Sequence, residues 1–235
     1  MALFRRAFAA IALIALAFAL AACGNKEAEQ RTAFVTFLQT RILDKPGVRV
    51  PKPTDAEKAS FGDYAQHYAV ISDFNAGMDQ SISQPMSAIM AKGSLRSIGD
   101  VVARRDDVQT AREAMTAVRG ALDGQLAKAE AARAALKQPD DLKAVFDKAY
   151  ERTVHTPAST VKEVFPAVDA VFAQALEIAD YIQQNRSKIE ISGASIQVRD
   201  AAVQARLNEM LQRLNAQSGA INAAQRKLQS VLRGT

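Results

Sequence analysis

Apolar residues recur at steps of three and four along much of the chain, which predicts a protein built from amphipathic helices. The clearest stripe lies in residues 54–82, at Phe61, Tyr64, Tyr68, Ile71, Met78 and Ile82. Thr54, with Glu57 three residues later, has the form of a capping box, so we expect this helix to begin there. Pro85 should kink or split it, because a proline inside a helix lacks the N–H donor and clashes with the preceding turn.

Two further segments repeat their apolar residues every seven positions. Residues 98–137 do so at Val108, Met115, Leu122, Ala129 and Leu136, and residues 200–232 at Leu207, Leu214, Ile221 and Leu228. This spacing favours long antiparallel helices packed at shallow angles. The stripe of the last helix could close the bundle or form an exposed surface for another protein. We expect it to close the bundle, since an unpaired stripe of this length invites aggregation.

Shorter helices are predicted between these segments. A first helix should occupy residues 31–43, and another should start at Asp140 and Asp141, where acidic side chains suit the positive end of a helix dipole. A third should begin with Thr156 as its cap and Pro157 in its first turn. Pro166 is expected to break that helix early.

One segment alternates apolar and polar residues, as a strand does. Lys188–Ser192 and Ser195–Val198 show this pattern on either side of Gly193-Ala194. The sequence thus predicts a mainly all-α fold: an antiparallel helical bundle with long helices and one small β-hairpin near residues 188–198. Residues 31–235 are expected to form a single helical domain, which is long enough to bury a real core.

The N-terminus has the pattern of a secretory signal peptide. Arg5 and Arg6 precede an uncharged apolar run from Ala7 to Ala22, and this run is short for a transmembrane helix, which needs ~20 apolar residues. We therefore expect residues 1–22 to be a signal peptide that is removed.

The apolar run ends in Leu20-Ala21-Ala22-Cys23, a pattern that resembles the bacterial lipobox. Cys23 would then be the lipidated residue, and residues 23–30 a lipidated tether. The alternative is an ordinary membrane anchor with a chance cysteine. The cysteine count argues against it, because the single cysteine of the chain stands where a thiol is needed for lipidation. A lone cysteine can form neither an internal disulfide nor a thiolate zinc cluster.

Lipoprotein sorting rules place the protein on the periplasmic side of the cell envelope of a Gram-negative bacterium. Several acyl chains on one cysteine hold a protein firmly, whereas a single chain binds only marginally. In enterobacteria-like sorting, aspartate after the cysteine retains a lipoprotein at the inner membrane. Gly24 stands there instead, which favours the outer membrane.

The charge of the mature chain argues against a nucleic-acid partner. Removing Arg5 and Arg6 lowers the 30 basic residues to 28 against 25 acidic ones, a formal charge of +3. That balance is a feature of a solvated surface. In the densest basic stretch, Arg96, Arg104, Arg105 and Arg112 alternate with Asp100, Asp106 and Asp107. This pattern predicts a salt-bridged helix face.

The motif most suggestive of catalysis is Ser159-Thr160-Val161-Lys162, which matches the S-x-x-K of serine enzymes that use a lysine base. Its usual partner motifs, K-T-G and S-D-N, are missing. His67 and His155 have no second histidine or cysteine at metal-ligand spacing, so we expect no metal and no cofactor. A solvated helix turn is the simpler interpretation of Ser159 and Lys162.

The chain resembles the YiaF-type lipoproteins of Gram-negative bacteria, a domain-of-unknown-function family. The similarity begins at Gln30-Arg31 and Phe37-Leu38-Gln39 and is most specific from residue 134 to residue 158, with Ala134-Ala135-Leu136-Lys137-Gln138, Asp140-Asp141-Leu142-Lys143 and Thr156-Pro157-Ala158. The resemblance implies an envelope lipoprotein and identifies no catalytic residue.

These observations favour a lipid-anchored, non-catalytic binding or scaffolding protein of unknown specific role. It would contact the membrane through the lipid on Cys23 and a protein partner in the envelope. One alternative is a periplasmic serine hydrolase that uses Ser159 and Lys162. Another is a lipid- or small-ligand-binding module with an apolar cavity between helices.

Overall fold

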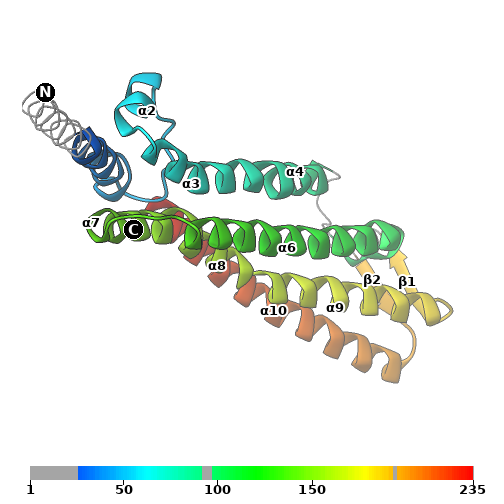
Figure 1. Cartoon of the computed structure of the whole chain (residues 1–235). Helices are drawn as coiled ribbons and strands as arrows, with labels where there is room; N and C mark the ends of the chain where they lie inside the picture. Colours follow the sequence, from blue (N-terminus) through cyan, green and yellow to red (C-terminus); the bar gives the residue numbers. More distant parts are fainter. Residues whose placement is uncertain (1–25, 92–96, 193–194, 235) are drawn as a thin grey trace, which may run out of the picture.

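The computed structural model describes residues 26–91, 97–192 and 195–234. Within these ranges the chain forms an elongated bundle of long helices with one small hairpin, which confirms the predicted mainly all-α class (Figure 1). After a first helix over residues 26–38, the helices are α2 (Asp55–Phe61), α3 (Tyr64–Met78), α4 (Gln84–Ala91), α5 (Ile98–Ala103), α6 (Arg105–Ala134), α7 (Asp140–Tyr150), α8 (Thr156–Lys162), α9 (Phe165–Gln184) and α10 (Ala201–Arg233). The other elements are the π-helical turns η1 (Gln39–Leu43), η2 (Asp79–Ser83) and η3 (Glu151–His155) and the strands β1 (Ile189–Ser192) and β2 (Ser195–Val198).

The first helix begins earlier than its sequence pattern predicts. Residues 26–30, expected to belong to the tether, are already helical. Their polar side chains find partners on the bundle: Glu27 accepts a hydrogen bond from the hydroxyl of Tyr64, and the side chain of Gln30 lies over Gly62. The tether interpretation of residues 26–30 is therefore wrong, because tertiary contacts order a segment that carries few apolar residues.

Two prolines are accommodated without ending a helix. Pro85 follows η2 and Pro157 follows η3, so α3 continues through η2 into α4, and α7 continues through η3 into α8. The wider π turn relieves the clash that a proline ring makes with the carbonyl four residues earlier. Thr156 therefore does not cap the start of a helix, and the prediction that it does is wrong. It has helical dihedrals, and its hydroxyl donates to Glu151.

Two predicted helices are each divided. The capping box of Thr54 and Glu57 is present, but Gly62 ends α2 with a φ of 56°. The predicted helix over residues 98–137 is broken at Arg104, whose φ of −118° and ψ of 31° leave the helical region. The 30 residues of α6 therefore span about 45 Å rather than the ~60 Å of a continuous helix.

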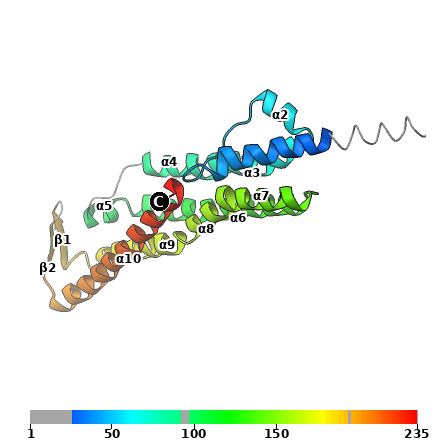
Figure 2. The ribbon, with the colours of Figure 1, turned by 90° about the vertical axis from the view of Figure 1, so that its left-hand side faces the viewer.

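The core has two main parts that share the long helices. An aromatic cluster joins the first helix to α2, α3 and α7 and consists of Phe34, Phe37, Phe61, Tyr64, Tyr68 and Phe146. Within it, the rings of Phe37 and Phe61 are 5.1 Å apart. A second cluster joins α9, the hairpin and α10 through Ile178, Ile182, Ile189, Val203, Leu207 and Met210. Figure 2 shows the hairpin at one end of the molecule and α2 with the first helix at the other.

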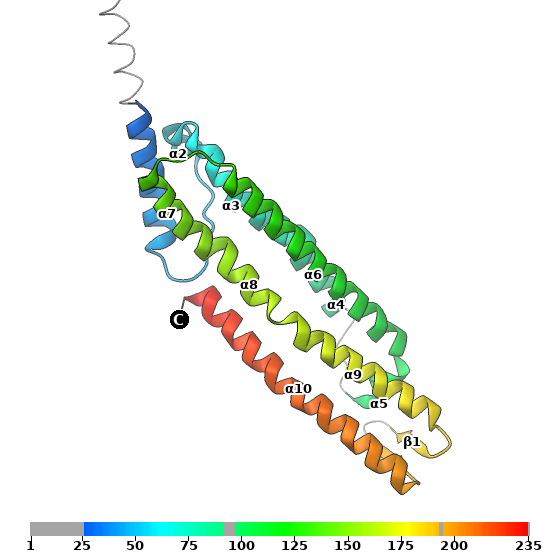
Figure 3. The ribbon, with the colours of Figure 1, turned by 60° about the horizontal axis from the view of Figure 1, so that its bottom comes forward.

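The hairpin forms as predicted, with β1 antiparallel to β2 and Ile189 opposite Val198. Gly193-Ala194, the expected turn, lies outside the described residues. The last helix, α10, starts from Asp200, whose carboxylate accepts hydrogen bonds from two backbone N–H groups. It runs back along α9 and α8 (Figure 3).

The four apolar residues that recur every seven positions along α10 are buried to different degrees. Leu207 is 2% exposed, whereas Leu214, Ile221 and Leu228 are half-buried. At its C-terminal end, the carbonyl of Leu232 accepts a hydrogen bond from the N–H of Val48 at 3.1 Å. The apolar stripe of α10 is therefore most deeply buried in the N-terminal part of the helix.

The predicted salt-bridged face is present on α6, and it connects that helix to α9. Arg105 donates to both carboxylate oxygens of Asp180, at 2.6 and 3.2 Å, and Arg112 does the same to Asp169, at 2.7 and 3.1 Å. Bidentate pairs of this kind fix orientation as well as add energy. Arg96 lies outside the described residues.

Candidate functional site

Cys23, the predicted lipidation site, lies outside the described residues. The helix that follows it is present from residue 26 onward, and two contacts hold its start to the bundle. Glu27 accepts the hydroxyl of Tyr64, and Arg31 lies 3.3 Å from the carboxylate of Asp141 at the start of α7. Two residues of the sequence lie between Cys23 and residue 26, the first described residue of this helix.

Ser159 and Lys162 lie on α8, but the structure does not join them in a catalytic pair. The Nζ of Lys162 lies 2.6 Å from Oδ1 of Asp123 on α6. Lys162 thus contacts a carboxylate on another helix rather than the hydroxyl of Ser159. Among the described residues, no hydrogen bond reaches the hydroxyl of Ser159. The arrangement suits a helix-to-helix contact.

His155, the last residue of η3, belongs to a small polar network directly before α8. Its Nδ1 lies 3.0 Å from Oε1 of Glu151, which also accepts the hydroxyl of Thr156 at 2.9 Å. His155 and Ser159 line one open hollow on the surface with Lys162. The four-residue spacing of Glu151 and His155 could have indicated this contact from the sequence. An exposed network of this kind stabilises the wide turn η3.

His67 has a more enclosed position, on α3. Its Nδ1 lies 3.1 Å from the amide nitrogen of Gln138, and its ring meets that of Tyr64 edge-on, with centroids 5.2 Å apart. Burial lowers the pKa of His67, although the carboxylate of Asp63 acts in the opposite direction. The imidazole is therefore neutral at pH 7. With the amide of Gln138 donating to Nδ1, the assigned tautomer carries its hydrogen on Nε2.

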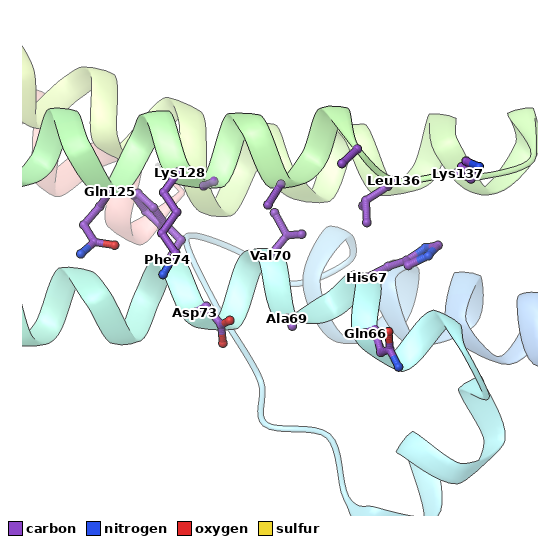
Figure 4. A pocket seen from close by; sticks show the side chains of 13 residues that line it. Gln66, His67, Ala69, Val70, Asp73, Phe74, Gln125, Lys128, Leu136 and Lys137 are labelled. Atoms are coloured by element: carbon purple, nitrogen blue, oxygen red, sulfur yellow. The ribbon is translucent and has the colours of Figure 1, made fainter.

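His67 lies at one end of a groove between α3 and α6, which is lined by both apolar and charged side chains (Figure 4). Its cavity volume is about 380 Å³. In Figure 4, Val70 and Phe74 project from α3 and Leu136 from the facing segment into the space between the helices. Three small side chains line the same space: Ala129 and Ala132 of α6, and Ala135 directly after it.

Charged groups also line this groove. Lys128 and Lys137 come from the α6 side and Asp73 from α3. Within the described ranges, none of these three side chains forms an ion pair. The groove therefore combines an apolar floor with two cationic groups that are available to an anion.

Sequence reasoning missed this groove, because its two walls are more than 50 residues apart along the chain. It also missed Arg152, whose guanidinium donates to the carbonyls of Leu43, at 2.8 Å, Lys45, and Gly47, at 3.1 Å. The first of these carbonyls ends η1, and the other two belong to the loop that follows it. Arg152, which lies in η3 directly after α7, therefore caps the C-terminal end of η1. No local signal marks an arginine that acts over such a separation.

No metal site can be assigned in the described ranges, where histidine, cysteine, aspartate and glutamate side chains do not come together in groups of three or more suited to a metal ion. In the same ranges, no helix has the length and apolar character that a membrane crossing requires.

Comparison with known proteins gives a family without an assigned activity. A family model described as "Protein of unknown function (DUF3053)" matches residues 11–229. The chain is 30% identical over 185 residues to "Uncharacterized protein YiaF" of Escherichia coli strain K12, covering 78% of each chain, and equally similar to the YiaF of Shigella flexneri. No solved structure matches. These matches confirm the resemblance to YiaF-type proteins, and the chain belongs to the DUF3053 family of proteins of unknown function.

Proposed function

We propose that this protein is a lipid-anchored, non-catalytic binding protein of the Gram-negative envelope, attached to the membrane through Cys23 and facing the periplasm. The observation that carries the proposal is the order Arg5-Arg6, an uncharged apolar run, and Leu20-Ala21-Ala22-Cys23. A signal peptide followed by a lipidated cysteine requires this order.

The start of the folded body supports an anchor at this position. The helix present from residue 26 is held to the bundle by the contact of Glu27 with Tyr64. An extended chain spans at most about 3.6 Å per residue, so the bundle end at Glu27 would lie within about 15 Å of the lipidated cysteine. The protein would thus stand on the membrane by the end that carries α2 and the start of α7.

A non-catalytic role is supported by the state of the S-x-x-K motif. Lys162 is engaged by Asp123, and Ser159 lies on an open helix surface. A fluorescent penicillin and a fluorophosphonate probe test this part of the proposal, with no labelling expected. Labelling that is lost in Ser159→Ala would contradict it.

The anchor is tested by Cys23→Ser in cells fed with labelled palmitate. This change should abolish labelling and leave a larger, uncleaved precursor, because the thiol that accepts the lipid is gone. Gly24→Ser, one residue further on, is the matched control and should keep both labelling and normal size. A mature form of normal size in Cys23→Ser would contradict the anchor.

The proposed membrane is tested by separating inner and outer membranes on a density gradient. The wild-type protein, with Gly24 after the cysteine, should be found with the outer membrane. Gly24→Asp should move it to the inner membrane. Wild-type protein in the inner-membrane fraction would contradict the outer-membrane assignment and leave the lipid anchor intact.

A further inference from the structure

The groove between α3 and α6 has the dimensions of a ligand site. Its volume of about 380 Å³ falls within the range of ~300–1,000 Å³ that small-molecule sites occupy. Along α3 it extends from Gln66 to Phe74, about 12 Å at the rise of an α-helix. Its shape is therefore long and narrow, which suits an extended chain better than a bulky ring system.

Gln125 lies at the end of the groove that is farther from the first helix (Figure 4). The side chain of Gln125 packs directly on Gly77, where an added Cβ would be 2.4 Å from Oε1 of the glutamine. The amide of Gln125 also donates to Ser81 at 3.4 Å. Beyond Gln125, towards the first helix, the alanines of α6 leave the space that larger side chains would fill.

The walls match the chemistry of an amphiphile. Val70, Phe74 and Leu136 are apolar and project into the groove (Figure 4). Lys128 and Lys137 supply positive charge without an ion-pair partner in the described part of the chain, and Asp73 is the single acidic group among the lining residues. An apolar chain with an anionic headgroup would satisfy both features at once.

The groove also lies near the anchored end of the bundle. His67 at its border contacts Tyr64, and Tyr64 donates to Glu27 in the first helix. Under the proposed function, Glu27 is four residues from the lipidated Cys23. The groove would then be close to the membrane surface, where single lipid molecules are the most concentrated amphiphiles.

We propose that the groove between α3 and α6 binds an acyl chain of an anionic phospholipid taken from the bilayer, with Lys137, at the His67 end of the groove, contacting the headgroup (Figure 4). This proposal rests on the proposed membrane anchor for the source of the lipid. The apolar floor holds part of the chain, and Lys137 selects a negative headgroup over a zwitterionic one.

The test uses the mature lipidated protein in nanodiscs that contain a phospholipid with a photoactivatable acyl chain. Two headgroups are compared, phosphatidylglycerol and phosphatidylcholine. After illumination, labelled peptides should come from residues 66–74 and 125–137, with more label from phosphatidylglycerol. Ala132→Phe should reduce this labelling about tenfold, since excluding two methylene groups from the groove has an effect of that size on affinity.

Matched variants test whether the labelling depends on residues that line the groove. Ala131→Phe places the same side chain at an exposed neighbouring position that does not line the groove, and it should label like the wild type. Lys137→Gln should keep labelling but remove the preference for phosphatidylglycerol, whereas Lys128→Gln, at the other end of the groove (Figure 4), should keep both. Circular dichroism of each variant confirms that the helices remain folded.

Several outcomes would overturn the proposal. Equal labelling in Ala132→Phe and Ala131→Phe would show that the lipid does not enter the groove. Label from a photoactivatable chain carried on Cys23 itself, with none from the bilayer phospholipid, would refute the proposed source. Because these measurements use protein already in a nanodisc, their failure would leave the palmitate test of the anchor unaffected.

Discussion

Gly47 offers the most direct test of how the loop after η1 meets the end of α10. It has a φ of 70°, and an added Cβ would lie 2.3 Å from the carbonyl oxygen of Leu232. Gly234, with a φ of 76°, approaches from the other side, since a Cβ there would be 2.2 Å from the nitrogen of Gly47. The loop after η1 and the end of α10 thus touch backbone to backbone.

The cost of Gly47→Ala can be estimated from two contributions. A left-handed conformation costs a residue with a Cβ about 1–2 kcal/mol. The backbone must also move away from Leu232, which breaks the hydrogen bond from the N–H of Val48, worth about 1 kcal/mol. We expect a total loss of about 2–3 kcal/mol, which lowers Tm by about 4–12 °C in a chain of this size.

Gly124→Ala is a control of opposite sign. Gly124 lies within α6 at an exposed position, with no atom within 4 Å of an added Cβ. Alanine there should stabilise the helix by up to ~1 kcal/mol. Urea unfolding of both variants, followed by circular dichroism, gives the two free energies. If the free energy of unfolding of Gly47→Ala lies within about 0.5 kcal/mol of the wild-type value, the docking of α10 against this loop is refuted.

Three further changes test the packing, the charges and the caps by the same unfolding assay. Leu207→Ala should cost ~2–5 kcal/mol, because it leaves a cavity at a position that is 2% exposed, while Leu228→Ala, half-buried on the same helix, should cost clearly less; equal losses would contradict the graded burial of α10. Asp180→Asn should reduce stability by less than about 1 kcal/mol at pH 7. Arg105 lowers the pKa of this carboxyl from its ordinary 3.8, so the difference from the wild type should disappear as pH falls below that value, and a difference that grows in acid would refute the assignment. Thr54→Ala should cost ~1 kcal/mol through loss of the capping box, and an unchanged stability would show that α2 does not need it.

Local patterns in the sequence determined several elements. The alternation in residues 188–198 predicted the hairpin, and the capping box at Thr54 placed the start of α2. Each of these depends on residues a few positions apart, whose geometry follows from a single turn of helix or one strand pair. The apolar stripes likewise identified most of the buried residues, because burial of one face is what drives a helix into a core.

Tertiary structure decided where helices continue and where they stop. Pro85 and Pro157 suggested interruptions, yet the chain passes both through π turns, while Gly62 and Arg104 break helices that the stripes alone would continue. Helix propensities differ by at most a few kcal/mol, so packing against neighbouring helices can override them in either direction. A sequence pattern shows which face is apolar but not how the helix bends to bury it.

The candidate site depends on tertiary structure in the same way. The S-x-x-K motif indicated a possible pair between Ser159 and Lys162, but Lys162 contacts Asp123, which lies on another helix. The groove between α3 and α6 carries no local signal, because its lysines and apolar residues become neighbours only when the two helices pack side by side. The sequence by itself determined the helical class and the apolar faces of the helices, and it carries the N-terminal pattern from which lipidation is predicted. Only the packing of distant segments decided which side chains share a pocket, because contacts of that kind depend on where each helix passes in space.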